Sequence, residues 1–222
     1  MASAAQEELK TFAQACRRVG EAGLLRCSSG NMSWRVGEDL MVVSGTRTWL
    51  ERVTADDAVL CRISDGEVLN DRRPSIESRF HAGILRARPD VNVVLHFQSP
   101  DATAVCCGEP EKTNFFVILE VPYYIGRPAV VEYLPAGSPE LASAIVEAAG
   151  DHDMILLKNH GQVTVGTDFD DAIQKAVFFE LACHVLLHGK DVRPLSDADV
   201  EPLLAAQRAR NMAGELPRTP TV

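Results

Sequence analysis

Two polar side chains follow a short apolar run, and their types and spacing suit a metal ion. Residues 91–95 predict a buried strand, and His96 and Gln98 stand at its end, two positions apart. Side chains alternate across a strand, so these two project from the same face. A nitrogen donor and an oxygen donor on one face could form half of a metal site. The alternative is a hydrogen-bonded histidine beside a surface glutamine, and this segment alone favours that alternative.

An expected hairpin brings two clusters of small polar residues together. Alternating side chains predict strands at 32–36 and 40–43, which turn at 37–39. Because an antiparallel hairpin returns to where it began, the SSGN segment at 28–31 and the SGT segment at 44–46 should lie side by side. Hydroxyls and exposed N–H groups there would form a cup for an anion. Two ordinary turns are the alternative, because Ser, Gly and Asn are common turn residues.

An acid stands at the start of a predicted helix. Pro74 and Ser75 open a helical pattern that Pro89 closes, and Ser75 is the expected N-cap. Glu77 lies in the first turn and His81 lies one turn later. A carboxylate at this position could act in a site, or it could only interact favourably with the helix dipole. The expected buried stripe is Ile76, Phe80, Ile84 and Leu85.

Three further histidines differ in their surroundings. The strand expected at 154–157 leads into a turn that contains His160, and a strand at 162–165 follows. His184 and His188 lie four apart in a helix expected at 169–189, a spacing that can bind metal. No glutamate accompanies them in an H-E-x-x-H arrangement, and leucines crowd them. We interpret His184 and His188 as structural.

The elements that must position these side chains alternate between helix and strand. Further helices are expected at 4–21, 101–107, 139–149 and 196–211, and further strands at 58–63, 68–70, 115–119 and 129–133. Several strands pair as hairpins, which implies a mixed, largely antiparallel sheet with helices over its faces. We find no repeat or linker and expect one domain over 1–222, in which a last helix and a mobile tail occupy 196–222.

Composition excludes several classes of function. The 222 residues are 46% hydrophobic and 24% charged, as in a globular protein, and the net charge is −9. No basic run occurs, so we expect no nucleic-acid partner. No apolar run reaches about 18 residues, so we expect no membrane span. The N-terminus lacks a signal peptide pattern, and the six cysteines show no C-x-x-C spacing. Free thiols and a cytoplasmic location are the simplest expectation.

Four segments, in this order, resemble one known family. They are SSGNMS, PSIESRFH, VVLHFQSPDATAV and LLKNHGQVTVG, and they resemble the motifs of the class II aldolase/adducin family, which includes fuculose-phosphate aldolase and ribulose-phosphate 4-epimerase. The resemblance covers about residues 9–189. It implies an α/β fold, a three-layer α/β/α sandwich around a mixed, mainly antiparallel sheet. The family usually forms a C4 homotetramer with sites near subunit interfaces.

The resemblance also implies a site. His96, His160 and Glu77, with Gln98 as a further candidate, would hold one divalent ion per subunit, and Glu77 would also be the catalytic acid or base. Tyr123 or Tyr124 would be the partner acid. The phosphate of a small sugar substrate would be bound by Ser29, Gly30, Asn31, Ser44, Gly45 and Ser75.

Two positions depart from the family pattern. Gln98 replaces the second histidine of H-x-H, and Ile76 replaces the second serine of P-S-S-E. An amide oxygen is a weaker ligand than imidazole and favours Mn²⁺ or Co²⁺ over Zn²⁺. The loss of the serine removes one hydroxyl from the phosphate cup.

The chemistry that the resemblance implies is an aldolase reaction. A ketose 1-phosphate, such as fuculose 1-phosphate or a deoxy or alkylthio sugar, would be cleaved to dihydroxyacetone phosphate and an aldehyde through a metal-stabilised enediolate. The alternatives are an epimerase, a dehydratase or a decarboxylase of the same family, and a non-catalytic, adducin-like binding module. The presence of Glu77, His96 and His160 favours an enzyme.

Overall fold

A seven-stranded sheet forms the centre of the chain. The computed structural model describes residues 2–213, and within them the strand order is β3-β2-β1-β4-β7-β6-β5. Neighbouring strands are antiparallel except for β5 and β6, which are parallel. The mixed, mainly antiparallel sheet is therefore confirmed. The strands are β1 (Asn31–Gly37), β2 (Leu40–Ser44), β3 (Ala58–Arg62), β4 (Val93–Phe97), β5 (Ala129–Val131), β6 (Met154–Leu157) and β7 (Gly161–Gly166).

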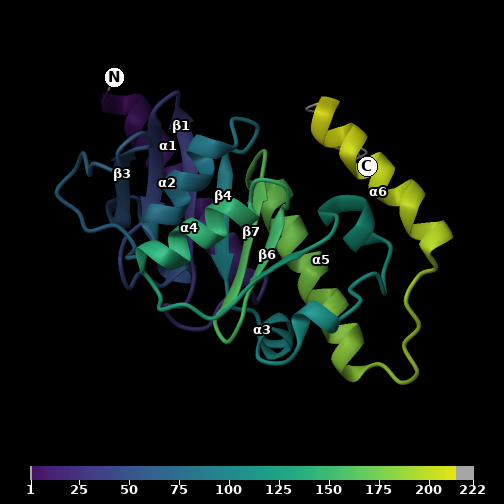
Figure 1. Cartoon of the computed structure of the whole chain (residues 1–222). Helices are drawn as coiled ribbons and strands as arrows, with labels where there is room; N and C mark the ends of the chain where they lie inside the picture. The colour runs from purple at the N-terminus through teal and green to yellow at the C-terminus, as the bar shows by residue number, and fades with distance from the viewer. Residues whose placement is uncertain (1, 214–222) are drawn as a thin grey trace.

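Helices cover both faces of this sheet, as Figure 1 shows. The helices are α1 (Ala2–Glu21), α2 (Ser78–Ala87), α3 (Pro100–Cys106), α4 (Pro139–Ala148), α5 (Phe169–His188) and α6 (Asp197–Ala213). One apolar core joins α2 and α4 to the sheet, and a second joins α1, α3 and α5 to its opposite face. The three-layer α/β/α sandwich is confirmed. Helix α6 stands further out and packs on the short π-helix Val121–Ile125.

The alternation of side chains along β4 determines which face of the sheet His96 lies on. Every residue of this strand is buried, because helices cover both faces. Val93, Leu95 and Phe97 enter the core beneath α1, α3 and α5, whereas Val94 enters the core beneath α2 and α4. Each such fully buried side chain contributes about 1.5–3 kcal/mol to stability. His96 shares the parity of Val94, and therefore faces α2.

The start of α2 differs from the prediction. The helix begins at Ser78, because residues 74 and 75 pair in extended conformation with the end of β2. Gly45 and Pro74 form a β-bridge, and the N–H of Ser75 donates to the carbonyl of Ser44 at 3.0 Å. Ser75 is therefore not the N-cap. Its Oγ accepts the N–H of Glu77 at 3.2 Å within the preceding turn. Ile76 is 66% exposed, so its predicted place in the buried stripe was wrong.

Two expected strands also differ. Residues 115–119 form no strand; Phe115 is buried against Phe179, with ring centroids 5.1 Å apart. Residues 68–70 make only one bridge, between Val68 and Cys61, because the Asn70 side chain takes up the next backbone groups, Leu60 N and Ala58 O. This segment still covers the outer edge of β3.

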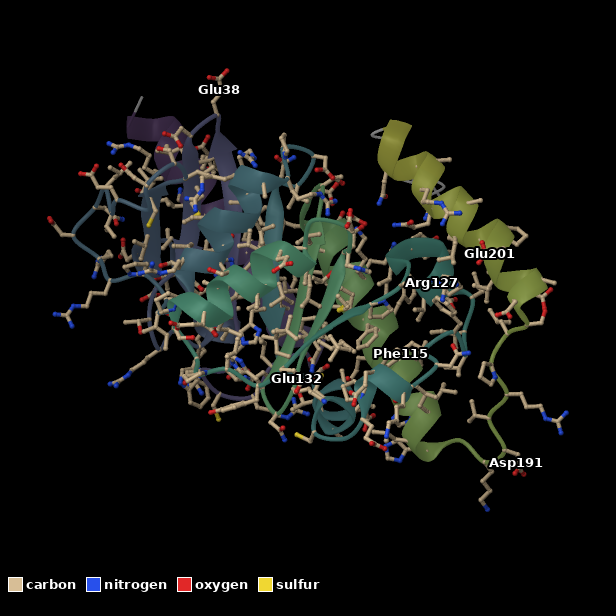
Figure 2. All side chains as sticks on the ribbon, viewed as in Figure 1. Glu38, Phe115, Arg127, Glu132, Asp191 and Glu201 are labelled. Carbon is tan, nitrogen blue, oxygen red and sulfur yellow. The ribbon has the colours of Figure 1, made fainter. Side chains whose placement is uncertain are left out.

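The surface carries paired charges, and the cysteines form no disulfide bonds. Figure 2 shows Glu38 at the tip of the β1–β2 hairpin and Arg127 beside Glu201 of α6, to which it is paired at 3.4 Å. All six cysteines are free. Among residues 2–213, no helix is long and apolar enough to cross a membrane. The tail expected at 215–222 lies outside the described residues.

Candidate functional site

Three side chains from distant parts of the sequence converge at one end of the sheet. Glu77 precedes the first turn of α2, His96 lies on β4, and His160 lies in the turn between β6 and β7. Glu77 Oε2 lies 3.6 Å from His96 Nε2, and Glu77 Oε1 lies 3.6 Å from His160 Nε2. One ligand atom from each residue lies within 4.8 Å of the others. Two imidazoles and a carboxylate in this arrangement can hold a divalent ion.

The surroundings of His96 and His160 favour forms of imidazole that can bind a metal. His96 Nδ1 lies 2.8 Å from the carbonyl of Gln162, so Nδ1 carries the proton that this bond needs. Burial, together with the neighbouring His96, lowers the pKa of His160 to about 4, so its imidazole is neutral at ordinary pH. Neutral imidazole is the form that binds metal.

A buried chain of hydrogen bonds holds the Glu77 carboxylate in place. Asn31 Nδ2 donates to Glu77 Oε2 at 2.8 Å, and Asn31 Oδ1 lies 2.5 Å from His81 Nε2. His81 Nδ1 lies 2.8 Å from Ser33 Oγ. Since the Asn31 oxygen must accept, Nε2 of His81 carries the proton, and Ser33 donates to Nδ1. His81 is fully buried and orients Asn31, the residue that holds Glu77.

The residues present fit a divalent ion. Among the described residues, Glu77 Oε1 is buried and has no hydrogen-bond partner, which is costly for a carboxylate unless a cation is bound. Gln98 lines the same cavity. The absence of a side chain at Gly161 leaves room for the Gln98 side chain, because a Cβ at position 161 would lie 2.7 Å from Gln98 Cγ and 3.2 Å from His96 Cε1. Glycine is thus required next to His160, a candidate metal ligand.

The predicted anion cup opens beside these ligands. A cavity of about 600 Å³ is lined by five of the six predicted phosphate residues, namely Ser29, Gly30, Asn31, Gly45 and Ser75. The hairpin does bring its two polar clusters together. Ser44 does not reach the cavity with its side chain: it is buried, and its Oγ accepts the N–H of Met32 at 3.2 Å. The amide of Asn31 is directed to Glu77 instead of outward.

Two arginines at this cavity were missed from the sequence. Arg47 and Arg73 line it, together with Ser28 and Thr46. The N–H of Thr46 donates to the carbonyl of Arg73 at 3.0 Å, so the backbone pairing that anchors the cup also sets both arginines at its rim. The sequence did indicate them, because Arg47 directly follows the SGT segment and Arg73 directly precedes Pro74 and Ser75. They place positive charge at this cavity in a chain of net charge −9.

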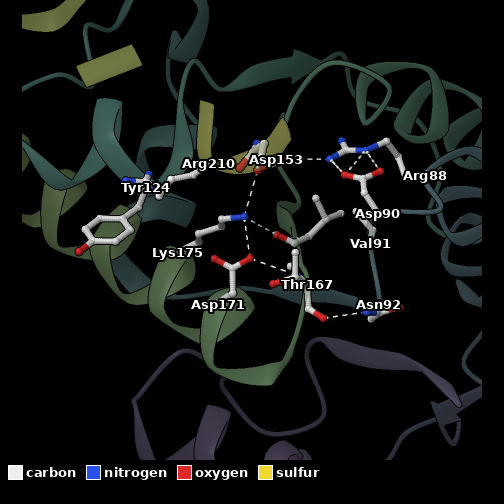
Figure 3. A pocket seen from close by; sticks show the side chains of 13 residues that line it. Arg88, Asp90, Val91, Asn92, Tyr124, Asp153, Thr167, Asp171, Lys175 and Arg210 are labelled. Atoms are coloured by element: carbon white, nitrogen blue, oxygen red, sulfur yellow. Dashed lines mark hydrogen bonds and ion pairs between the residues drawn. The ribbon is translucent and has the colours of Figure 1, made fainter. Parts of the chain in front are cut away.

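The structure does not bring the two predicted tyrosines to this cavity. Tyr124 lines a separate pocket of about 250 Å³, shown in Figure 3. The guanidinium of Arg210 lies 3.9 Å from the ring centroid of Tyr123 and 5.1 Å from that of Tyr124. Within one chain, neither tyrosine stands beside Glu77.

The charges in that second pocket are paired with one another. Lys175 Nζ lies 3.0 Å from both Asp153 Oδ2 and Asp171 Oδ2, and Arg88 lies 3.1 Å from Asp153 Oδ1 (Figure 3). Burial opposes the charge on Lys175, but the two carboxylates outweigh it and raise its pKa. This cluster joins α5 to the sheet, and we interpret it as structural.

Two imidazoles and a carboxylate thus face a cavity lined by small hydroxyl residues, glycines and two arginines, at the end of a mainly antiparallel sheet in an α/β/α sandwich. The chain belongs to the family described as Class II Aldolase and Adducin N-terminal domain, which matches residues 10–187. The family resemblance expected from the four motifs is confirmed, and a divalent metal site of Glu77, His96 and His160 is consistent with this family.

Relatives with different activities match this chain. It is 29% identical over 208 residues to the 3-oxo-tetronate 4-phosphate decarboxylase of Haemophilus influenzae, covering 91% of this chain and 98% of that protein. It is 31% identical over 173 residues to the L-fuculose phosphate aldolase of Methanococcus maripaludis, covering 78% and 92%. It is also 32% identical over 168 residues to the 5-methylthioribulose-1-phosphate/5-deoxyribulose-1-phosphate aldolase of Rhodospirillum rubrum, covering 75% and 74%.

Solved structures share the fold. YgbL from Escherichia coli superposes with a TM-score of 0.82 at 22% identity, covering 90% of this chain and 99% of that one. An L-fuculose 1-phosphate aldolase superposes with a TM-score of 0.79 at 21% identity, covering 94% and 98%. At these identities the likeness concerns the fold alone.

Proposed function

We propose that this protein is a divalent-metal-dependent lyase that breaks a carbon–carbon bond in a small phosphorylated sugar. The first candidate reaction is cleavage of a ketose 1-phosphate to dihydroxyacetone phosphate and an aldehyde. One observation carries the proposal: Glu77, His96 and His160 converge at a cavity whose rim is lined by small hydroxyl residues, glycines and two arginines. Ligands for the ion and donors for a phosphate thus face one space.

Each residue has a role that follows from its contacts. A divalent ion, when bound, supplies Lewis acidity that stabilises negative charge on the substrate oxygens. His96 Nε2 and His160 Nε2 would hold it. Asn31 holds Glu77 Oε2, which leaves Oε1 to bind the ion or to move a proton at the substrate carbon. Gln98 would be a weak oxygen ligand.

The other end of the substrate would be bound at the rim. Ser29, Gly30 and Ser75 offer hydroxyl and backbone groups to a phosphate, and Arg47 and Arg73 add charge-assisted hydrogen bonds. Binding energy from the phosphate would position the reacting carbonyl at the ion, which is a means of raising the rate as well as the affinity.

A second candidate reaction is decarboxylation of a phosphorylated 3-oxo sugar acid. It is favoured by the Haemophilus relative, whose match extends over 91% of this chain and almost all of its own length. Such a substrate carries a carboxylate as well as a phosphate, and two arginines at the rim provide for two anionic groups. Loss of carbon dioxide and loss of an aldehyde leave the same kind of carbanion, so one site can serve either chemistry.

Two product assays on the Mn²⁺-, Co²⁺- or Zn²⁺-loaded enzyme distinguish the candidates. Dihydroxyacetone phosphate with a panel of short aldehydes would give a ketose phosphate with an aldolase. A 3-oxo sugar acid phosphate would release carbon dioxide with a decarboxylase. Glu77→Gln should lower turnover by about 10²–10⁴-fold in the active assay, whereas His152→Ala, at a surface histidine, should not. Absence of both products with every metal would refute the proposal and leave the epimerase, the dehydratase and the adducin-like binding module.

The homotetramer that the resemblance implies is part of the same proposal. Tyr123 and Tyr124 lie away from the site of their own chain, so a role as partner acid would require a site on another copy. Sedimentation measures the assembly. In a tetramer, Tyr123→Phe or Tyr124→Phe should lower kcat with little change in KM; if neither does, the tyrosine role is excluded.

A further inference from the structure

A second group of metal donors lies outside the cavity, where α3 meets the last turns of α5. Asp101 Oδ2 lies 2.7 Å from His184 Nδ1, and Asp101 Oδ1 lies 3.0 Å from His188 Nε2. The two imidazole centroids are 4.5 Å apart. One ligand atom from each residue lies within 4.8 Å of the others. The donor set, two imidazoles and one carboxylate, is the same as at the first site.

The carboxylate of this group is held in place from α5. Glu180 Oε1 accepts the N–H of Asp101 at 3.0 Å, and Glu180 Oε2 accepts the N–H of Ala102 at 2.8 Å and the hydroxyl of Ser99 at 2.6 Å. Glu180 thereby caps the start of α3. Residues 180, 184 and 188 follow each other at helical spacing, so one stripe of α5 both fixes Asp101 and supplies the two imidazoles.

The accessibility of the three side chains suits an ion that keeps some of its water. The side chains of His184 and His188 are 58% and 57% exposed, and that of Asp101 is 19% exposed. The Asp101 carboxylate lies within hydrogen-bond distance of both imidazoles, so the three donors are already close together. The leucines that follow His184 do not enclose it, and our interpretation of the pair as merely structural needs revision.

We propose that Asp101, His184 and His188 bind a second divalent ion of the borderline class, such as Zn²⁺, Ni²⁺ or Co²⁺. Three protein ligands leave one or more positions for water. The ion would replace the two hydrogen bonds to Asp101 and join α3 to the end of α5. The ion would have a structural role, stabilising the contact between α3 and α5, and this role does not depend on the lyase reaction.

Zinc binding to variants of the full chain tests this site separately from the first. Equilibrium dialysis against Zn²⁺, followed by metal analysis, should give two ions per chain in the wild type. His96→Ala with His160→Ala should leave one ion, and adding His184→Ala with His188→Ala should leave none. His152→Ala, at a histidine outside both groups, is the matched control and should not change the count.

A stability measurement gives an independent readout. In the His96→Ala, His160→Ala background, Zn²⁺ should raise Tm, and His188→Asn should abolish that rise while leaving Tm in chelator within a few degrees. If the group only makes hydrogen bonds, the change in Tm from His188→Asn will be equal with and without Zn²⁺. That equality, or absence of zinc from the His96→Ala, His160→Ala protein, would overturn the proposal.

Discussion

Acid should destabilise this protein in a way that can be traced to His81. This imidazole is fully buried between Asn31 and Ser33, and burial lowers its pKa to about 3. In the unfolded chain its pKa is about 6.5. As the pH falls below about 6.5, the unfolded state takes up a proton that the folded state does not, so stability is lost progressively until about pH 3.

The size of the effect follows from these two values. Between about pH 7.5 and about pH 5, the difference in proton binding by His81 removes about 2 kcal/mol from the free energy of unfolding. His81→Gln should abolish this contribution, because an amide does not titrate, while its N–H can still donate to Asn31. The variant also leaves the Ser33 hydroxyl without its acceptor, which costs about 1 kcal/mol at every pH.

Urea unfolding at both pH values, in chelator and at one subunit concentration, measures this difference. The other titratable groups are the same in both proteins, so their contributions cancel between wild type and His81→Gln. Ser33→Ala serves as the control: it removes the same hydrogen bond but keeps the imidazole, so its loss of stability with pH should match the wild type. If wild type and His81→Gln lose equal stability between the two pH values, His81 is not the buried neutral imidazole described above.

Three further predictions concern the cavity. Gly161→Ala would place a Cβ 2.7 Å from Gln98 Cγ, and the displaced ligands should weaken metal binding by about 10–100-fold; unchanged affinity in a metal titration would contradict this. Gln98→His should tighten Zn²⁺ binding if residue 98 faces the ion, and an unchanged Kd would place it outside the coordination shell. Arg47→Ala and Arg73→Ala should each raise KM for a phosphorylated substrate by about 10–100-fold, since a hydrogen bond to a charged group contributes about 1.5–3 kcal/mol; an effect on kcat alone would argue against phosphate binding.

Much of the sheet was predictable because its strands have strong local patterns. The β1–β2 hairpin, β4, β6 and α5 lie close to where alternation or helical spacing placed them. The predicted strand at 115–119 was wrong because a short apolar run does not distinguish a strand from a buried loop. There, Asn114 Oδ1 accepts the N–H of Phe116 at 3.0 Å, which favours a turn over sheet pairing.

The site was predictable as a set of residues, but its contacts were not. The four motifs gave Glu77, His96 and His160 together, and the structure brings them together. The role of Asn31 could not be read from its motif, because the bond to Glu77 crosses from β1 to the start of α2. Arg47 and Arg73 were missed because the pairing that sets them at the rim depends on backbone contacts between distant segments.

The two edges of the sheet constrain how copies of this chain can associate. Beyond β3, the backbone of Glu67 and Leu69 already bonds to Arg62 and Leu60, so that edge is occupied. At the other end, β5 has only three residues, and Pro128 before it has no N–H to donate. An unpaired edge strand can pair with a strand of another chain, and neither edge of this sheet offers a long row of unpaired backbone groups. We therefore expect any association between copies of this chain to use side-chain surfaces and loops, without a sheet that continues from copy to copy, and we expect little aggregation by edge pairing.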